Sequence, residues 1–221
     1  MRCSLVSGGS EGTTGVLIID DLSVARSPQP TLLSGNFWVN PSFELGSNLD
    51  QSGGTLTNWN RGGSDPTLCQ VITNNFASST HALAVVDPNT SGYGEWYSDV
   101  PLAGHASAGD VLNLQWFEML RLPNGEMRLT VQFFDAADPV VGTTHFVATG
   151  QSAGWQGAIE TSGFLRRNQS LAVPPGAVKM RCSLVSGGPE TTTGLMVIDD
   201  LSVALPPRAA LLAGNFWTNA T

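Results

Sequence analysis

Apolar and polar residues alternate with a period of two in many short stretches of the chain, each bounded by Gly, Pro, Asn or Asp. This pattern is typical of β-strands with one buried face. The clearest predicted strands are residues 111–118, 127–134, 178–184 and 195–203, and weaker ones cover 37–45, 82–86, 96–102 and 145–149. No stretch has the period of an amphipathic helix. The pattern therefore predicts an all-β fold, a sandwich of two antiparallel sheets.

The composition limits the partners that the protein can have. With 10 Lys and Arg against 18 Asp and Glu, the 221-residue chain carries a formal net charge of −8, which disfavours binding to nucleic acid or to an anionic membrane surface. Its apolar runs, such as residues 16–19, are far shorter than the roughly 20 residues that span a bilayer. We therefore expect no nucleic-acid partner and no membrane insertion.

The two ends of the sequence are copies of one another. Residues 1–42 match residues 180–221 at 28 of 42 positions, without a gap and with an offset of 179 (180 minus 1). Such duplication is typical of tandem arrays, so we interpret the chain as a window of an array, with one complete repeat. The predicted organisation is the last two strands of a preceding repeat at 1–25, a linker at 26–35, a complete β-sandwich at 36–204, a linker at 205–213 and the first strand of the following repeat at 214–221.

Residues 1–25 carry an apolar face with no core of their own to cover it. An isolated two-stranded hairpin is marginally stable, and its exposed edges invite pairing with other strands. We expect this segment to complete the preceding domain of the array, or to dock as added strands into a neighbouring chain.

Several motifs occur in the order seen in one family of binding proteins. These motifs are Asn40-Pro-Ser-Phe-Glu44, Trp59, His81-Ala-Leu-Ala-Val85, residues 109–117, Trp155 and Val197-Ile-Asp-Asp-Leu-Ser-Val203. Over roughly residues 36–204 the chain resembles jelly-roll carbohydrate-binding modules of the xylan- and glucan-binding kind, which have a galactose-binding-like fold. The resemblance implies a jelly-roll β-sandwich that binds a polysaccharide or a cell-surface glycan in an extracellular protein.

The resemblance also implies a structural calcium, held by Glu44 together with Asp199 or Asp200. Strand parity places Asp199 on the same face as Val197, Leu201 and Val203, which is the apolar face. A buried carboxylate needs a cation or several hydrogen-bond donors, and calcium prefers such oxygen ligands. The alternative is that Asp199 accepts backbone N–H bonds at a sandwich corner and binds no metal. The segment around His81 contains no acidic residue, where relatives often add another ligand.

A carbohydrate site needs aromatic platforms together with amide, carboxylate or Arg side chains. Parity in three strands predicts an outward set on one concave sheet, and the loop at 91–97 adds two rings. The predicted ligand residues are Asn113, Gln115, Phe117, Arg128, Gln132, Arg181, Tyr93 and Trp96. The alternative is an ordinary solvated face, or one packed against a neighbouring repeat.

The repeat also changes the cysteine count, because Cys3 is the copy of Cys182. Each unit then holds Cys69 and Cys182, either as a disulfide or as two buried thiols. No nucleophile elbow, metal-ligand spacing of His or phosphate-binding Gly-rich loop is present in the sequence. We therefore predict a non-catalytic, carbohydrate-binding-module-like repeat of a secreted or cell-surface protein. The alternative is a structural repeat of an extracellular filament, stalk or adhesin that assembles head to tail with copies of itself.

Overall fold

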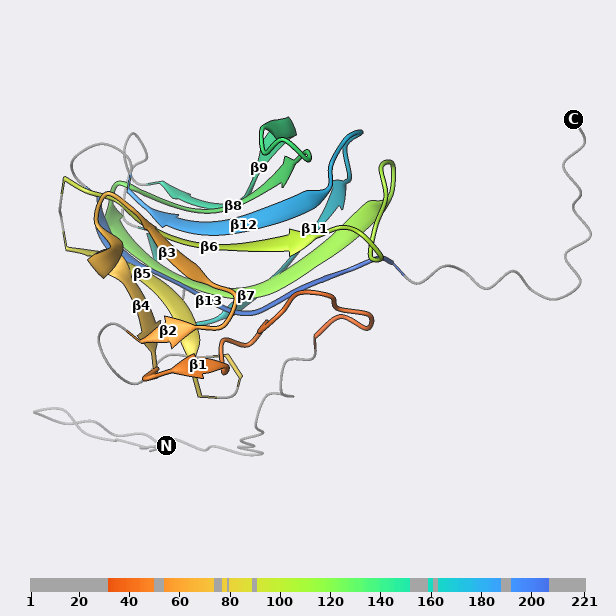
Figure 1. The fold of residues 1–221 in the computed structure, drawn as a ribbon. Helices are drawn as coiled ribbons and strands as arrows, with labels where there is room; N and C mark the ends of the chain where they lie inside the picture. The colour runs from red at the N-terminus through yellow and green to blue at the C-terminus, as the bar shows by residue number, and fades with distance from the viewer. Residues whose placement is uncertain are drawn as a thin grey trace, which may run out of the picture.

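The computed structural model describes residues 32–49, 54–73, 77–78, 80–88, 91–151, 159–160, 163–187 and 192–206. Nearly all of its regular structure is β, and two antiparallel sheets lie face to face (Figure 1). The six-stranded sheet contains β4 (Cys69–Ile72), β5 (Ala82–Pro88), β7 (Val111–Asn124), β10 (Ile159–Glu160), β11 (Leu165–Ala172) and β13 (Thr193–Ala204). The five-stranded sheet contains β3 (Asn60–Gly63), β6 (Gly94–Pro101), β8 (Glu126–Phe134), β9 (Val140–Gln151) and β12 (Lys179–Ser186). The predicted all-β, two-sheet sandwich is confirmed.

Three small elements lie outside the two main sheets. Strands β1 (Gly46–Ser47) and β2 (Thr55–Leu56) pair with each other, and a 3₁₀ turn, η1 (Pro66–Leu68), precedes β4. Asp65 caps this turn by accepting a hydrogen bond from the Thr67 backbone N–H. These elements connect the first part of the chain to the edges of both sheets.

The core lies between the sheets and is built by the alternation that the sequence shows. Leu112, Leu114 and Trp116 of β7 are buried against the facing layer, which includes Cys182 and Leu184 of β12. Apolar side chains alternate with polar ones along both strands, so each strand contributes one face to the core. Burial of this continuous apolar layer is the main force that holds the two sheets together.

The last two strands that the structure describes occupy the centres of the two sheets. Strand β12 pairs with β6 on one side and β8 on the other, and β13 lies between β7 and β5. The start of the described chain lies beside the end of β13, because the Phe37 N–H donates to the Val203 carbonyl at 3.0 Å and the Leu33 N–H donates to Ser202 Oγ at 3.3 Å. The predicted segments 1–25 and 214–221, and the linkers apart from residues 32–35 and 205–206, lie outside the described residues.

The predicted strand at 37–45 is wrong, since this segment forms turns. Asn40 and Phe43 both have a positive φ, of 53° and 60°. The Asn40 side chain accepts from the Leu45 N–H at 2.9 Å and donates to the Leu45 carbonyl at 2.8 Å. This side chain replaces the strand pairing that the alternation predicted, as Asn commonly does in turns.

A β-bulge in β13 overturns the predicted parity of its end. Between Asp199 and Ser202 the register against β7 shifts by one residue, and Asp200 has a φ of 49°. Val197 therefore packs in a cluster on the outer face of the six-stranded sheet, whereas Leu201 and Val203 belong to the core between the sheets. Asp199 is buried, as predicted, but it does not share a face with Leu201 and Val203.

Candidate functional site

A groove of about 480 Å³ lies on the outer face of the five-stranded sheet. This volume falls within the range of about 300–1,000 Å³ that is common for ligand sites. Its lining is mostly polar, with one exposed ring and two glycines that bring the backbone to the surface. The lining residues are Ser91, Gly92, Tyr93, Glu95, Arg128, Thr130, Gln132, Thr144, Val185 and Gly187.

Strand register arranges the groove in rows across the sheet. One row contains Glu95, Val185 and Arg128, on β6, β12 and β8. Another row ends on Gln132, whose Nε2 donates to Thr144 Oγ1 of β9 at 3.1 Å. Val185 therefore lies between two charged side chains, Glu95 and Arg128, in the groove.

The middle row of the sheet contains Tyr97, Ser183 and Thr130. Ser183 is buried, and among the described residues its Oγ has no hydrogen-bond partner. A buried hydroxyl in this position is a donor and an acceptor that the fold itself does not use.

Tyr93 is the exposed ring of the groove, with 44% of its surface accessible. Its backbone is fixed at both ends, because its N–H donates to Ser64 Oγ at 3.0 Å and its carbonyl accepts from the Asp65 N–H at 2.9 Å. Gly187, at a φ of +90°, lies so close that a Cβ there would approach Tyr93 Cβ to 2.9 Å. The ring is thus displayed from a rigid backbone.

A charged cluster borders the same face. The Arg181 guanidinium binds Asp99 with two hydrogen bonds of 2.6 and 2.9 Å and lies 4.6 Å from the centre of the Tyr97 ring. Lys179 Nζ lies 3.2 Å from Asp99 and 2.5 Å from Asp138. Burial alone would raise the pKa of Asp99, but the hydrogen bonds from Arg181 and Lys179 outweigh it and hold this pKa below its usual value. The cluster fixes the orientation of Arg181 and leaves little of its charge for a ligand.

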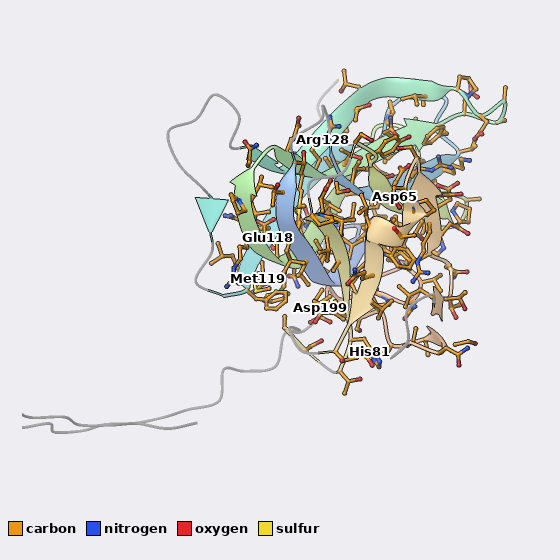
Figure 2. The ribbon with its side chains drawn as sticks, turned by 90° about the vertical axis from the view of Figure 1, so that its left-hand side faces the viewer. Asp65, His81, Glu118, Met119, Arg128 and Asp199 are labelled. Carbon is orange, nitrogen blue, oxygen red and sulfur yellow. The ribbon has the colours of Figure 1, made fainter. Side chains whose placement is uncertain are left out.

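The predicted ligand residues fall on two different sheets. Tyr93, Arg128 and Gln132 line the groove, and Arg181 lies on the same face, directly opposite Gln132 in register. Three of the other four, Asn113, Gln115 and Phe117, are on β7 in the six-stranded sheet, so the prediction that the ligand residues lie on one sheet is wrong. The fourth, Trp96, is on β6. Figure 2 shows the separation, with Arg128 of β8 and Glu118 of β7 in different layers.

Asn113 and Gln115 line a second hollow, of about 280 Å³, between β7 and β11, whereas Phe117 lies outside both hollows. Gln115 is buried there and accepts a hydrogen bond of 2.5 Å from Arg166, while Ser170 donates to Asn113. Its polar groups are therefore largely paired with one another. Whether any of the predicted ligand residues binds a sugar stays a prediction.

The prediction that Trp96 displays its ring is wrong. Trp96 is buried on the inner face of β6, and its Nε1 donates to the Ala84 carbonyl across the sandwich at 3.0 Å. The Arg61 guanidinium lies 4.7 Å from the ring centre. Trp96 therefore belongs to the core, as alternation from the buried Gly94 and Ser98 requires.

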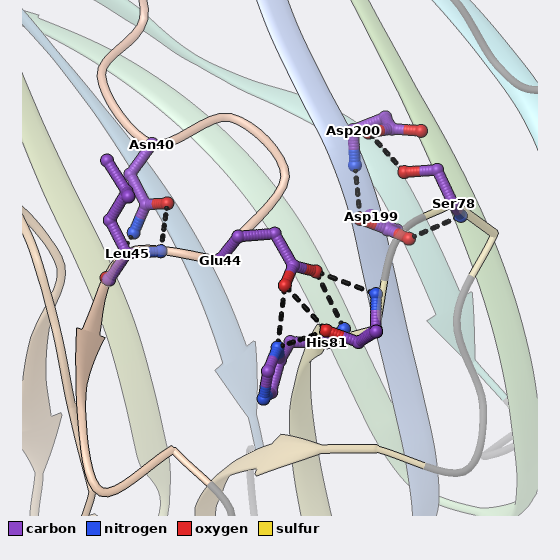
Figure 3. Close-up of polar contacts among 8 residues, drawn as sticks. Asn40, Glu44, Leu45, Ser78, His81, Asp199 and Asp200 are labelled. Carbon is purple, nitrogen blue, oxygen red and sulfur yellow. Dashed lines mark hydrogen bonds and ion pairs between the residues drawn. The ribbon is translucent and has the colours of Figure 1, made fainter.

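The predicted calcium ligand Glu44 is held by hydrogen bonds (Figure 3). Its Oε1 accepts from the backbone N–H groups of Thr80 and His81 at 2.9 and 2.8 Å. Its Oε2 accepts from Thr80 Oγ1 at 2.7 Å and lies 2.7 Å from His81 Nδ1. Burial alone would raise the pKa of Glu44, but the hydrogen bonds from His81 and Thr80 outweigh it and hold this pKa below its usual value.

Asp199 and Asp200 are buried nearby and also meet donors. Asp199 accepts from the Ala77, Ser78 and Asp200 N–H groups at 2.8, 2.9 and 2.7 Å, and Asp200 accepts from Ser78 Oγ at 2.7 Å (Figure 3). Burial raises the pKa of Asp199 to about 7, despite these bonds, and burial also raises the pKa of Asp200.

This arrangement is the alternative that the sequence left open, with Asp199 accepting backbone N–H groups at a sandwich corner. Donors rather than carbonyl oxygens face the carboxylates of Glu44 and Asp199, so the arrangement does not fit one ion shared by the two. Within the part of the chain that the structure describes, no three His, Cys, Asp or Glu side chains gather as a metal site would require. Calcium binding stays a prediction.

The two described cysteines are free and buried. Cys69 is on β4 and Cys182 is on β12, in opposite sheets. Burial raises the pKa of Cys69 to about 12 and raises that of Cys182 further still. The structure therefore selects the two buried thiols over the disulfide. Among the described residues there is also no helix long and apolar enough to cross a bilayer.

Comparison with known proteins places the fold. No protein-family profile and no curated protein matches the sequence. Among solved structures, the chain is similar to a family 61 carbohydrate-binding module in complex with β-1,4-galactotriose, at 16% identity and a TM-score of 0.50, over 78% of this chain and all of that one. It is also similar to the family 22 xylan-binding domain from Paenibacillus barcinonensis Xyn10C, at 11% identity and a TM-score of 0.46, over 74% and 90% of the two chains.

A further similarity is to the enzymatically active domain of tailspike protein 4 from bacteriophage CBA120, at 13% identity and a TM-score of 0.52. The match covers 77% of this chain but 21% of the tailspike chain, so the chain spans about a fifth of that protein's length. At such identities the likeness establishes the fold alone. The chain has the β-sandwich fold of carbohydrate-binding modules, as the motifs predicted.

Proposed function

We propose that the groove on the five-stranded sheet binds a polysaccharide chain and that the protein is a non-catalytic carbohydrate-binding module. The observation that carries this proposal is the groove itself, in which one fixed, exposed ring stands beside Arg128, Gln132 and Glu95. An exposed tyrosine ring offers a face for stacking on a sugar, and amide, carboxylate and guanidinium groups bind hydroxyls. The module of known structure that binds β-1,4-galactotriose, with the same fold, supports the ligand class.

In this proposal Tyr93 is the stacking platform, and Arg128 and Gln132 are hydrogen-bonding groups. Thr130 lines the groove between them on β8, next to the buried Ser183 of β12. Arg181 holds the edge of the face through Asp99. A protein that binds such polymers acts where the polymers are, so we place it outside the cell or on a cell surface.

Binding to a panel of soluble β-1,4-galactan, xylan and β-glucan, measured by affinity electrophoresis and calorimetry, tests the proposal. Arg128→Ala should weaken binding about tenfold or more, since a hydrogen bond to a charged group contributes about 1.5–3 kcal/mol. Tyr93→Ala should also weaken binding, because it removes the ring that stacks on the sugar. The matched control is Asn113→Ala, in the hollow of the opposite sheet. It should bind like the wild type.

Two results would reject the proposal. One is a folded protein that none of the polymers retains, which would favour the alternative of a structural repeat. The other is equal loss in Asn113→Ala and Arg128→Ala, which would move the site or implicate the fold. Release of reducing sugar ends during incubation would contradict the non-catalytic part.

A further inference from the structure

Residues 1–25 repeat nearly every side chain by which residues 180–204 are anchored in the sandwich; Lys179, which precedes them in β12 and pairs with Asp99 and Asp138, has no counterpart. The core residues of β12, Met180, Cys182 and Leu184, have identical counterparts at positions 1, 3 and 5. In β13, Ile198 to Ala204 are identical to residues 19–25, and the differences at 195–197 exchange one aliphatic or Met side chain for another of similar size. Volume-conserving exchanges of this kind are well tolerated in cores.

The polar contacts of the two strands are repeated as well. Arg181 binds Asp99 at 2.6 Å, Ser186 Oγ accepts from the Gly94 N–H at 3.0 Å, and Asp199 accepts from the Ala77 N–H at 2.8 Å. The counterparts of the three strand residues are Arg2, Ser7 and Asp20. Gly187 and Gly194, which have φ values of +90° and +154°, also have Gly counterparts, at 8 and 15. The duplicate therefore meets the steric, apolar and polar requirements of the place that β12 and β13 occupy.

The topology brings the duplicate within reach of that place. Leu33 and Phe37 are hydrogen-bonded to Ser202 and Val203 of β13. If a copy of β13 ended there at Ala25, residues 26–31 would have to connect it to Leu32. Six residues reach up to about 20 Å when extended, whereas the two points are neighbours. Sandwiches with adjacent ends tolerate such circular permutation.

We propose that the two strand positions now held by β12, between β6 and β8, and by β13, between β5 and β7, together form an exchange site. Residues 1–25 of the same chain occupy both positions when residues 180–204 leave them. The short connection makes the exchange intramolecular, so it needs no second copy. Residues 180–204 are then released with their apolar face uncovered. They can occupy the same place in the sandwich of another repeat or of another copy of the chain. This gives the duplication a role in assembly that is independent of sugar binding.

Native thiol labelling of the full chain tests the exchange, because each of the two competing segments carries one cysteine and the recipient carries a third. In the wild type, N-ethylmaleimide should label Cys3 and leave Cys69 and Cys182 protected, since both are buried. Leu184→Asp places a carboxylate in the core beside Trp96 and Leu129, where an unpaired charge is strongly unfavourable. In this variant we expect the reverse pattern, with Cys182 labelled and Cys3 protected at least tenfold.

The protection of Cys69, on β4, shows in every variant whether the β-sandwich is folded. Leu5→Asp alone should label like the wild type, and Leu5→Asp with Leu184→Asp should lose protection of Cys69. Leu184→Asp should elute as a monomer, and a dimer with Cys3 protected would contradict exchange within one chain. The proposal is also overturned if Leu184→Asp exposes Cys69, because the duplicate has then failed to restore the fold. It is equally overturned if Cys182 stays protected and Cys3 is labelled.

Discussion

The hydrogen bonds to Glu44 connect the turns at residues 37–45 to the residues just before β5. The substitution Glu44→Gln tests how much these bonds stabilise the folded protein. Four donor groups of Thr80 and His81 converge on this carboxylate at 2.7–2.9 Å. The glutamine keeps one oxygen acceptor but turns an NH₂ group toward backbone N–H donors. The substitution thus removes the charge and leaves at least one donor without an acceptor.

The expected cost follows from these contacts. A hydrogen bond to a charged group contributes about 1.5–3 kcal/mol, but the Glu44 side chain is 28% exposed, so water replaces part of what is lost. We expect a loss of about 2–3 kcal/mol, which for a domain of this size lowers Tm by about 5–10 °C. The matched control is Glu126→Gln, whose ion pair with Arg128 has a longer distance of 3.4 Å. It should cost less than about 1 kcal/mol.

Thermal unfolding followed by circular dichroism, with calcium and with EDTA, gives the measurement. The pKa of Glu44 is below its ordinary value of 4.5, so its stabilisation is complete above pH 4.5 and is lost as the pH falls through the lower, folded-state pKa. The difference between wild type and variant should therefore shrink in acid. A Tm difference below about 1 °C at pH 7 would refute this reasoning. A difference that exists with calcium and vanishes with EDTA would assign the stabilisation to an ion.

Three more predictions follow from burial and backbone geometry. Gly125→Ala should cost about 3 kcal/mol in urea unfolding, because a Cβ at its φ of +88° would lie 2.3 Å from Thr192 Cα, whereas Gly104→Ala meets no atom within 4 Å and should cost about 1 kcal/mol. The pKa of Asp199 is raised from 3.8 to about 7, so the folded state binds more protons in this window and stability should fall as the pH rises through it; Asp199→Asn should flatten this slope in melts from pH 4 to 8. The pKa of Cys69 is about 12, so iodoacetamide at pH 8 should modify it only after denaturant unfolds the protein, as mass spectrometry would show.

The alternation of side chains was sufficient to predict the fold class and the central strands. Strands β7, β8 and β12 alternate clearly because each has one face in the core, whereas β13 was predicted from its apolar residues and is buried on both faces. Strand β11 was not predicted, because most of its side chains are exposed and it shows no apolar period. The segment 37–45 alternates without forming a strand, since a single Asn side chain binds its backbone.

The candidate site was predicted only in part, since strand parity gives the face of a residue but not the sheet that its strand joins. Arg128 and Gln132 were found because β8 alternates strictly, whereas Gln115 was grouped with them although β7 lies in the other sheet. Thr144 was missed, because a short hydroxyl side chain carries no distinctive pattern. The bulge after Asp199 is a feature of the backbone, and no residue type in this part of the sequence predicts it.

The central position of β12 and β13 has a consequence for synthesis on the ribosome. Translation produces β3 to β11 first, and these strands include the partners on both sides of both central strands. Until β12 has emerged, the facing edges of β6 and β8 stay unpaired, and until β13 has emerged, so do those of β5 and β7, unless residues 1–25 fill these places as proposed above. Such edges pair readily with other chains. Where residues 1–25 do not fill these places, the nascent protein is exposed to aggregation from the synthesis of β5 to β8 until β13 emerges, and its dependence on chaperones should be greatest just before β13 emerges.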